Sequence, residues 1–210
     1  MRLFTILIIL NIISFLILAN AQFFGINEKF ITENILFSQK NFVSGAYWTV
    51  ITSLFVHADI MHLLLNMLGL YAFGKTAEKI YGSLKFILVY FVGGILSFLV
   101  GSFFYPSEAF LVGASGAIFS LLSLVMLSKP ISFSIVFFPL PLGLISFLYI
   151  VSNILSVIYR DKSNIGFFAH IIGFLIGFIF GIKWCPEWKK NFLVTLITFV
   201  IFLIIVVFIL

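Results

Sequence analysis

The chain has little charge and almost no cysteine. Only 9% of its 210 residues are charged, whereas 63% are hydrophobic and the mean hydropathy is +1.28. A soluble domain carries charge on about 25% of its residues, so this deficit excludes a soluble globular protein and predicts an all-α polytopic membrane protein. The single cysteine, Cys185, excludes an intramolecular disulfide and a multi-cysteine metal site.

Two kinds of sequence pattern are also missing. The chain contains no H-E-x-x-H pair, so a zinc site built from its three histidines is a weaker alternative. It has no convincing internal repeat, which argues against a solute transporter. The formal net charge of +5 comes from basic residues in loops and reflects topology rather than nucleic-acid binding. We therefore expect no metal, no cofactor and no nucleic-acid partner.

What the chain has instead is a series of long apolar runs. A helix that crosses a bilayer needs about 20 such residues, and on this criterion the runs predict seven spans. They lie near residues 3–24, 59–74, 84–105, 110–127, 142–159, 166–183 and 191–210. The lipid bilayer is therefore the expected environment of most of the chain.

Two connecting segments differ from the spans. Residues 25–58 interleave aromatic and polar side chains, which suits a loop in the membrane interface or an ordinary packed external loop. Residues 131–138 precede Pro139 and Pro141, and prolines disfavour regular helix in the residues before them. A short, packed, non-helical segment is expected there.

The basic residues of the loops predict an orientation, because cytoplasmic loops carry the excess of lysine and arginine. With the N-terminus inside, the cytoplasmic set is Arg2, Lys75, Lys79, Lys85, Lys129, Lys183, Lys189 and Lys190, and the external set is Lys29, Lys40, Arg160 and Lys162. The second, fourth and sixth spans then start on the outer side. The N-terminal run, which ends in Ala19-Asn20-Ala21, also resembles a cleavable signal peptide, but its length favours a retained first helix.

Polar residues gather at these three span starts. The clusters are His57–x4–His62–x3–Asn66, Gly113-Ala114-Ser115-Gly116 and Ala169-His170–x2–Gly173–x3–Gly177. If neighbouring spans alternate in direction, all three clusters lie on the same side at similar depth. Polar side chains inside lipid are costly, so their convergence predicts a functional site.

The residue types in the clusters suit nucleophilic acyl transfer. Ser115, between small residues near the start of a helix, offers a hydroxyl and accessible N–H groups for an oxyanion. His170 can accept the serine proton near neutral pH, whereas His62 and Asn66 lie on one helix face and can donate hydrogen bonds. The alternatives are tight packing of small residues and a purely structural histidine. His57 precedes its span and is more readily structural than catalytic.

The three motifs, in this order, resemble those of the rhomboid family of intramembrane serine proteases over about residues 48–181. The resemblance implies a six-helix core, residues 1–183, with a water-filled cavity that opens outward. Residues 184–210 would add a linker and a seventh transmembrane helix. The implied activity is hydrolysis of peptide bonds in or near transmembrane helices of single-span or polytopic membrane proteins. A catalytically silent rhomboid-like chaperone or binding protein is the alternative.

The resemblance also implies a role for each motif residue. Ser115 would be the nucleophile and His170 the general base of a Ser–His dyad. The side chains of His62 and Asn66 and the Ser115 N–H would form the oxyanion hole, and Phe119 would stack on the catalytic imidazole. The supporting set would be Gly113, Gly116, Ala169, Gly173, Gly177 and His57.

One position departs from the family pattern. The family often has Trp-Arg in the external loop, whereas Thr49 follows Trp48 here, which leaves the anchoring of that loop unexplained. Glu78, in the first inner loop, does match a family position. The short chain without a transit peptide predicts a multi-pass protein of the cell membrane whose active site opens to the external side. The sequence predicts no oligomeric state.

Overall fold

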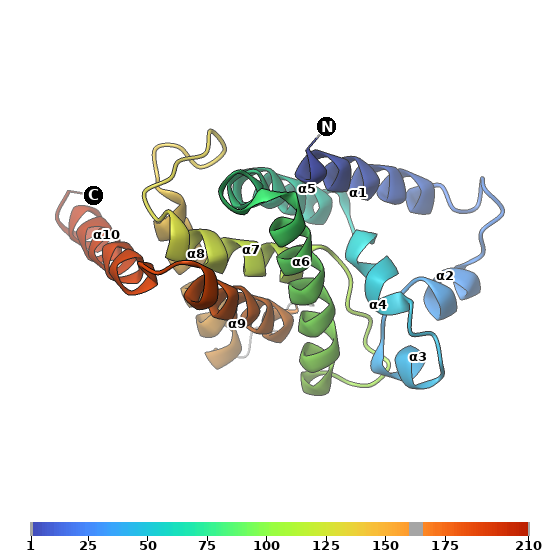
Figure 1. The fold of residues 1–210 in the computed structure, drawn as a ribbon. Coiled ribbons are helices and arrows are strands. Elements are labelled where there is room, and N and C mark those ends of the chain that lie inside the picture. Colours follow the sequence, from blue (N-terminus) through green and yellow to red (C-terminus); the bar gives the residue numbers. More distant parts are fainter. Residues whose placement is uncertain (1, 160–165, 210) are drawn as a thin grey trace.

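The computed structural model describes residues 2–159 and 166–209, which are helical apart from turns, loops and one isolated bridge between Phe37 and Leu111. The α-helices of this part of the chain are α1 (Leu3–Ala19), α2 (Glu28–Asn34), α3 (Gln39–Val43), α4 (Thr49–Thr52), α5 (Ile60–Gly69), α6 (Lys75–Gly101), α7 (Ser115–Ser128), α8 (Leu142–Ile158), α9 (Phe167–Trp184) and α10 (Trp188–Ile209) (Figure 1). A π-helical turn, Leu70–Gly74, joins α5 to α6.

By length and composition, three helical stretches among the described residues can cross a membrane. They are Ile60–Phe104, Phe167–Trp184 and Trp188–Phe208. The first contains a bend at Gly82, which divides it into two segments. Helices α1, α7 and α8 are also apolar but shorter, with 17, 14 and 17 residues. Short apolar helices fit a membrane protein in which some segments face protein rather than lipid. The predicted all-α polytopic membrane fold is confirmed.

Some span boundaries predicted from hydropathy are wrong. Helix α6 as a whole begins at Lys75, but Gly82, where φ is 78°, divides it, and the segment after this bend begins where the span near residue 84 was predicted. Helix α7 begins at Ser115 rather than 110, because Leu111 forms a bridge to Phe37 and Gly113 has a φ of 105°. Helix α1 ends at Ala19, well before residue 24. Residues 131–138 are non-helical, as the prolines predicted.

Part of the predicted charge pattern falls on residues just beyond the described ranges. Arg160 and Lys162, assigned to the external side, and the last residue of the predicted seventh span lie outside the described residues. The orientation of the bundle therefore stays a prediction.

Helix α7 is the centre of the fold, with α6, α8, α9 and α10 packed against it (Figure 1). All its residues after Ser115 are buried. Its closest partner is α9, where a Cβ built on Gly177 would lie only 1.8 Å from the carbonyl oxygen of Ser120. The Ser123 hydroxyl crosses the same interface and donates to the Phe174 carbonyl at 2.7 Å. Small residues in one helix thus let its backbone approach that of the other.

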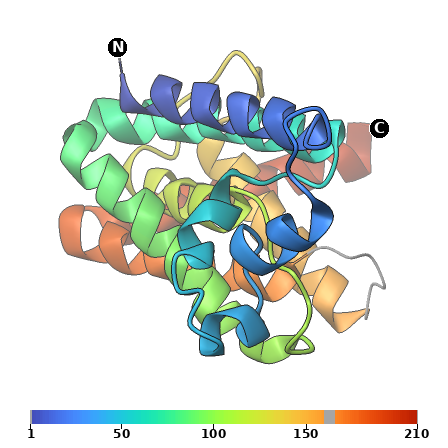
Figure 2. The same ribbon diagram turned by 90° about the vertical axis from the view of Figure 1, so that its right-hand side faces the viewer.

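Glu78 holds the N-terminus of α1 against α6. The N–H groups of Leu3 and Phe4 donate to its two carboxylate oxygens, each at 3.0 Å, and the Ser83 hydroxyl donates to it at 2.7 Å. A carboxylate at a helix N-terminus satisfies donors that have no intrahelical acceptor and faces the positive end of the helix dipole. Helix α1 buries Phe4 and Leu7 and lies along α5 (Figure 2). This packing fits a retained first helix.

The loop between α1 and α5 is folded and held by side-chain hydrogen bonds. Trp48 Nε1 donates to the carbonyl of Asn34 at 2.8 Å, and Asn41 Nδ2 donates to the carbonyl of Thr32 at 2.6 Å. Thr49 is buried, and its hydroxyl donates to a carbonyl three residues earlier. These bonds hold the loop without an arginine after Trp48.

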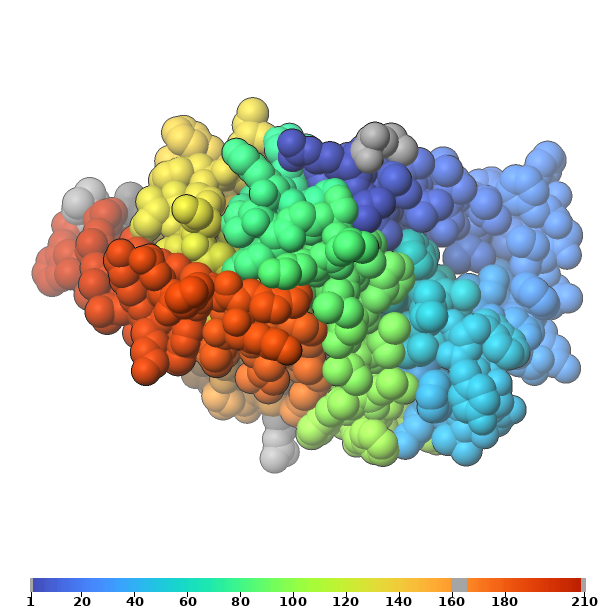
Figure 3. All heavy atoms as spheres, viewed as in Figure 1, coloured from blue at the N-terminus to red at the C-terminus, as the bar shows by residue number. Residues whose placement is uncertain are grey.

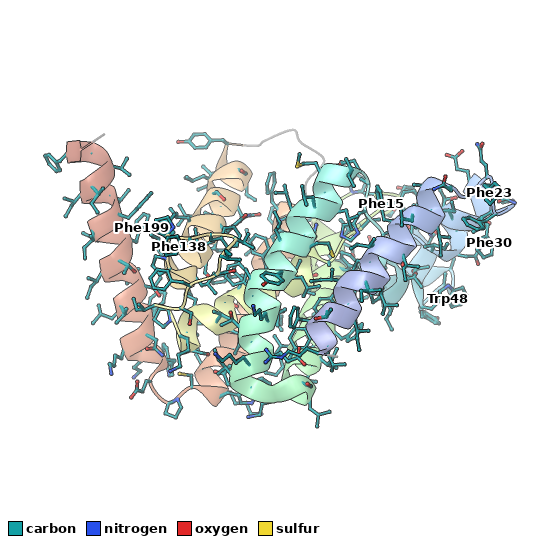
Figure 4. The ribbon with its side chains drawn as sticks, turned by 90° about the horizontal axis from the view of Figure 1, so that it is seen from above. Phe15, Phe23, Phe30, Trp48, Phe138 and Phe199 are labelled. Carbon is teal, nitrogen blue, oxygen red and sulfur yellow. The ribbon has the colours of Figure 1, made fainter. Side chains whose placement is uncertain are left out.

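The same loop carries exposed aromatic side chains. Phe23, Phe30 and Trp48 are 86%, 50% and 52% exposed and lie together at one end of the molecule (Figure 4). Helix α10 forms the opposite end (Figure 3). Aromatic rings favour the headgroup region of a bilayer, so the exposure fits the interfacial interpretation of this loop.

Helix α10 packs on the bundle through specific contacts. Asn191 Nδ2 donates to the carbonyl of Leu127 at 2.8 Å, which ties the start of α10 to the end of α7. The ring centroids of Phe147 in α8 and Phe199 in α10 lie 4.8 Å apart. The division of the chain at residues 183 and 184 stays a prediction.

We predict that Gly177→Ala destabilises the folded protein, because its methyl group would collide with the Ser120 carbonyl. Overpacking of this kind typically costs about 1–3 kcal/mol. The measurement is the midpoint of thermal unfolding in detergent, followed by tryptophan fluorescence. Gly166→Ala is the matched control, since a Cβ there would meet nothing closer than 3.7 Å. Equal midpoints for the two variants would contradict the close α7–α9 contact.

Candidate active site

Ser115 and His170 face each other across the α7–α9 interface. Ser115 is the first residue of α7 and His170 the fourth of α9, and the distance from Ser115 Oγ to His170 Nε2 is 2.7 Å. One turn further along α9, a Cβ on Gly173 would lie 2.2 Å from the carbonyl oxygen of Gly116. The glycine contact that joins the two helices therefore also sets the distance between the two side chains.

An aromatic ring fixes the plane of the His170 imidazole. Phe119, one turn after Ser115, stacks on it with ring centroids 4.5 Å apart and an interplanar angle of 4°. Tyr149 of α8 packs edge-on against Phe119 at 6.1 Å. The Phe119 ring of α7 thus covers one face of the imidazole, and Tyr149 of α8 packs against that Phe119 ring.

His62 and Asn66 lie one turn apart on α5, close to the loop that enters α7. The Ala58 N–H donates to His62 Nδ1 in a long hydrogen bond of 3.4 Å, so in the neutral ring the hydrogen is on Nε2. A Cβ built on Gly113 would lie 2.6 Å from that Nε2, which places the donor edge of His62 beside the loop. Asn66 is buried, and its Nδ2 donates to the carbonyl of His62 at 2.8 Å, which leaves a second amide hydrogen.

The loop before α7 gives the start of that helix no side-chain cap. The Gly113 N–H donates to the carbonyl of Ser53 at 2.9 Å, and φ of Gly113 is 105°, a conformation that suits glycine. Ala114, the N-cap, makes no side-chain capping hydrogen bond. The first N–H groups of a helix lack intrahelical acceptors, and together with the helix dipole they can stabilise an oxyanion formed at Ser115.

His57 packs against His62 rather than against the Ser–His pair. The two rings meet edge-on, with centroids 5.0 Å apart. Burial, reinforced by the neighbouring His62, lowers the pKa of the His57 imidazole to about 4, which keeps it neutral near pH 7. Among residues 2–159 and 166–209, no three histidine, cysteine or acidic side chains form a group that could hold a metal ion. The arrangement gives no geometric basis for the three-histidine zinc site.

The sequence reasoning missed Asn153. This residue of α8 is buried, and its Oδ1 lies 2.8 Å from His170 Nδ1, on the side of the ring opposite Ser115. A polar residue within an apolar helix was the available signal, because polar side chains at membrane depth tend to be functional. The sequence spacing of Asn153 and His170 does not predict their contact, since that contact depends on how α8 packs against α9.

The structure brings Ser115 and Phe119 into direct contact with His170 and places Gly113 beside His62, which bonds to Asn66 and packs on His57. Gly116, Ala169, Gly173 and Gly177 lie along the packed helices, with Gly173 against Gly116 and, farther from the Ser115–His170 pair, Gly177 against Ser120. A hydroxyl hydrogen-bonded to an imidazole, beside neutral donors and a free helix N-terminus, can perform nucleophilic attack on a carbonyl. The individual roles stay predictions.

The chain matches a family model described as the Rhomboid domain over residues 44–187. It is 32% identical over 204 residues to "RHOMBOID-like protein 12, mitochondrial" of Arabidopsis thaliana, with 84% of this chain and 58% of the relative covered. It is 31% identical over 150 residues to "Putative rhomboid protease YdcA" of Bacillus subtilis (strain 168), with 70% of this chain and 72% of the relative covered.

A third relative matches a shorter region. "Rhomboid protease GluP" of Bacillus subtilis (strain 168) is 36% identical over 94 residues, which is 45% of this chain and 17% of the relative. The chain thus spans only part of several curated relatives, 58% of the first Arabidopsis protein and 42% of "RHOMBOID-like protein 6, mitochondrial".

We predict that Gly113→Ala slows the reaction of Ser115 with a fluorophosphonate probe by about a hundredfold, the typical effect of losing one oxyanion donor. The new methyl group would displace His62 from beside the helix start. Gly45→Ala is the matched control, because Gly45 has a similar φ of 100° but a Cβ there would meet nothing within 4 Å. A normal labelling rate in Gly113→Ala would show that His62 is not a donor in this site.

Proposed function

Because the chain belongs to the rhomboid family, we propose that it is an intramembrane serine endopeptidase that uses a Ser115–His170 dyad. The observation that carries the proposal is the hydrogen bond of 2.7 Å between Ser115 Oγ and His170 Nε2. It lies beside an uncapped helix N-terminus and the donor edge of His62. A structural serine needs neither of these neighbours.

In the first half of the reaction, His170 Nε2 takes the proton of Ser115 as Oγ attacks the carbonyl carbon of the scissile peptide. The oxyanion of the tetrahedral intermediate accepts hydrogen bonds from the Ser115 N–H and from His62 and Asn66. The bond from carbon to nitrogen then breaks, and His170 gives its proton to the leaving amine. The product is an acyl-enzyme with an ester bond to Ser115.

In the second half, water replaces the amine. His170 takes a proton from a water molecule as its oxygen attacks the ester carbon, and the same donors hold the second oxyanion. The bond from carbon to Ser115 Oγ breaks, and the proton on His170 returns to Oγ. Every step uses side chains of this chain and water, and we expect no cofactor.

The proposed substrates are single-span or polytopic membrane proteins cut in or near a transmembrane helix. Helical carbonyls are already hydrogen-bonded, so the segment that reaches Ser115 must be locally unwound. We propose a location in the cell membrane, with the N-terminus inside and the site open to the external side. The loop lysines support this orientation.

The alternative is a rhomboid-like protein that binds unwound helices without cutting them. Several curated relatives are named only as rhomboid-like, so family membership alone does not choose between the two functions. The tight Ser115–His170 hydrogen bond favours the enzyme, because binding alone does not require a base on the serine.

We predict that Ser115→Ala and His170→Ala each abolish cleavage of a panel of single-span substrates in proteoliposomes, because each removes one member of the dyad. Ser120→Ala is the matched control, since that hydroxyl also lies on α7 but bonds to backbone carbonyls. A chelator should leave the wild-type rate unchanged. Binding of substrate that survives in both dyad variants, without any cleavage by wild type, would favour the binding-protein alternative.

We predict a graded effect for the oxyanion donor. Asn66→Ala should lower kcat by about a hundredfold yet leave detectable turnover, because other donors remain. Thr76→Ala serves as the control, since its hydroxyl also bonds to a carbonyl four residues earlier but lies outside the site. Full activity in Asn66→Ala would remove this residue from the oxyanion hole.

A further inference from the structure

The His170 ring has a polar partner on each side. Ser115 Oγ lies 2.7 Å from Nε2, and Asn153 Oδ1 lies 2.8 Å from Nδ1. Three helices therefore contribute to one line of hydrogen bonds: α7 supplies the serine, α9 the imidazole and α8 the amide. The dyad mechanism uses the serine and the imidazole and gives the amide no role.

The orientation of the Asn153 amide follows from its second contact. Its Nδ2 donates to the carbonyl oxygen of Tyr149 at 2.9 Å, one turn earlier on α8. A carbonyl oxygen can only accept a hydrogen bond, so the nitrogen of the amide must face Tyr149. The amide oxygen is then the atom that faces His170.

This orientation determines which nitrogen of His170 carries the hydrogen. An amide oxygen can only accept, so the hydrogen bond with Asn153 requires a hydrogen on Nδ1. In a neutral imidazole the other nitrogen then has a free lone pair, and that nitrogen is Nε2, which faces Ser115. The Tyr149 carbonyl thus fixes the orientation of the Asn153 amide. That amide in turn fixes the His170 tautomer in which Nε2 can accept the proton of Ser115.

We propose that Asn153 is a positioning residue that holds His170 in the Nδ1–H tautomer required of a base. The Phe119 ring fixes the plane of the imidazole, but a stacked ring does not distinguish one tautomer from the other. Asn153 supplies that distinction. The inference rests on the proposed proteolytic function, because only a histidine that acts as a base must have its hydrogen on one particular ring nitrogen.

The first test reads the tautomer directly and needs no catalytic activity. The chain has only three histidines, so a full-length sample with ¹⁵N-labelled histidine in detergent gives few imidazole signals. A His170→Asn sample assigns the signals of this ring. We expect protonated Nδ1 and unprotonated Nε2 in wild type, and loss of that pattern in Asn153→Leu, whose side chain has the same branched shape but no hydrogen-bond acceptor. An unchanged ring in Asn153→Leu would overturn the inference.

The second test follows kinetics with the same variants. Asn153→Leu should lower kcat by about tenfold or more and change KM less than about twofold, because a misoriented base affects proton transfer rather than binding. Asn153→Asp should keep most of the wild-type kcat, since a carboxylate oxygen also accepts a hydrogen bond from Nδ1–H. Ser152→Ala is the matched control: its exposed hydroxyl donates to the same Tyr149 carbonyl but lies away from His170.

The outcomes separate the inference from the function on which it rests. Wild type that neither cleaves a substrate nor reacts with a fluorophosphonate would reject the proposed protease. Active wild type with an equally active Asn153→Leu, or with an effect on KM alone, would reject the positioning role and leave the dyad intact. If Asn153→Leu has a lowered unfolding midpoint, Asn153→Ala replaces it in both tests. A higher kcat in Asn153→Asp than in Asn153→Ala would then support the positioning role, and equal values would reject it.

Discussion

The close approach of α7 and α9 is the contact on which the rest of the structure depends. In a bilayer, lipid tails are as apolar as leucine, so helices associate through close packing and hydrogen bonds rather than by escape from water. Gly173 and Gly177 allow backbone contact, and Ser123 adds a hydrogen bond to the Phe174 carbonyl. Because Ser115 and His170 lie at one end of this interface, the contact that holds the fold together also sets the distance between these two side chains.

Small residues hold α7 from a second side, which explains how a helix of 14 residues can lie at the centre of a membrane protein. A Cβ on Gly116 would lie 2.0 Å from the hydroxyl of Ser97, and a Cβ on Gly93 would lie 2.1 Å from that of Ser120. Helix α6 therefore also packs closely on α7, with glycines facing serine hydroxyls. Since α7 faces protein on all sides, it does not need the length that a lipid-facing span requires.

Hydropathy and motif spacing could predict the helical class and the motif residues that meet, because both depend on local sequence. Ser115 and His170 lie beside the small residues that form the interface, so their meeting could be predicted from the pattern. The start of α7 could not be predicted, because hydropathy contains no information on the bridge between Leu111 and Phe37 or on the positive φ of Gly113. Asn153 was missed for a related reason: its contact with His170 depends on the packing of α8, which no spacing encodes.

The site assembles two imidazoles with opposite tautomers, and neutral groups determine both. The Ala58 N–H leaves His62 with its hydrogen on Nε2 as a donor, whereas the Asn153 amide leaves His170 with a free Nε2 as an acceptor. A carboxylate could orient His170 as well, but it would add a charge at membrane depth, where charge is costly. With an amide, charge would arise only during the proposed reaction, as an imidazolium and an oxyanion close together. Their mutual attraction in a medium of low dielectric offsets part of the cost of forming them, which makes a neutral orienting group better suited to this environment than an ionised one.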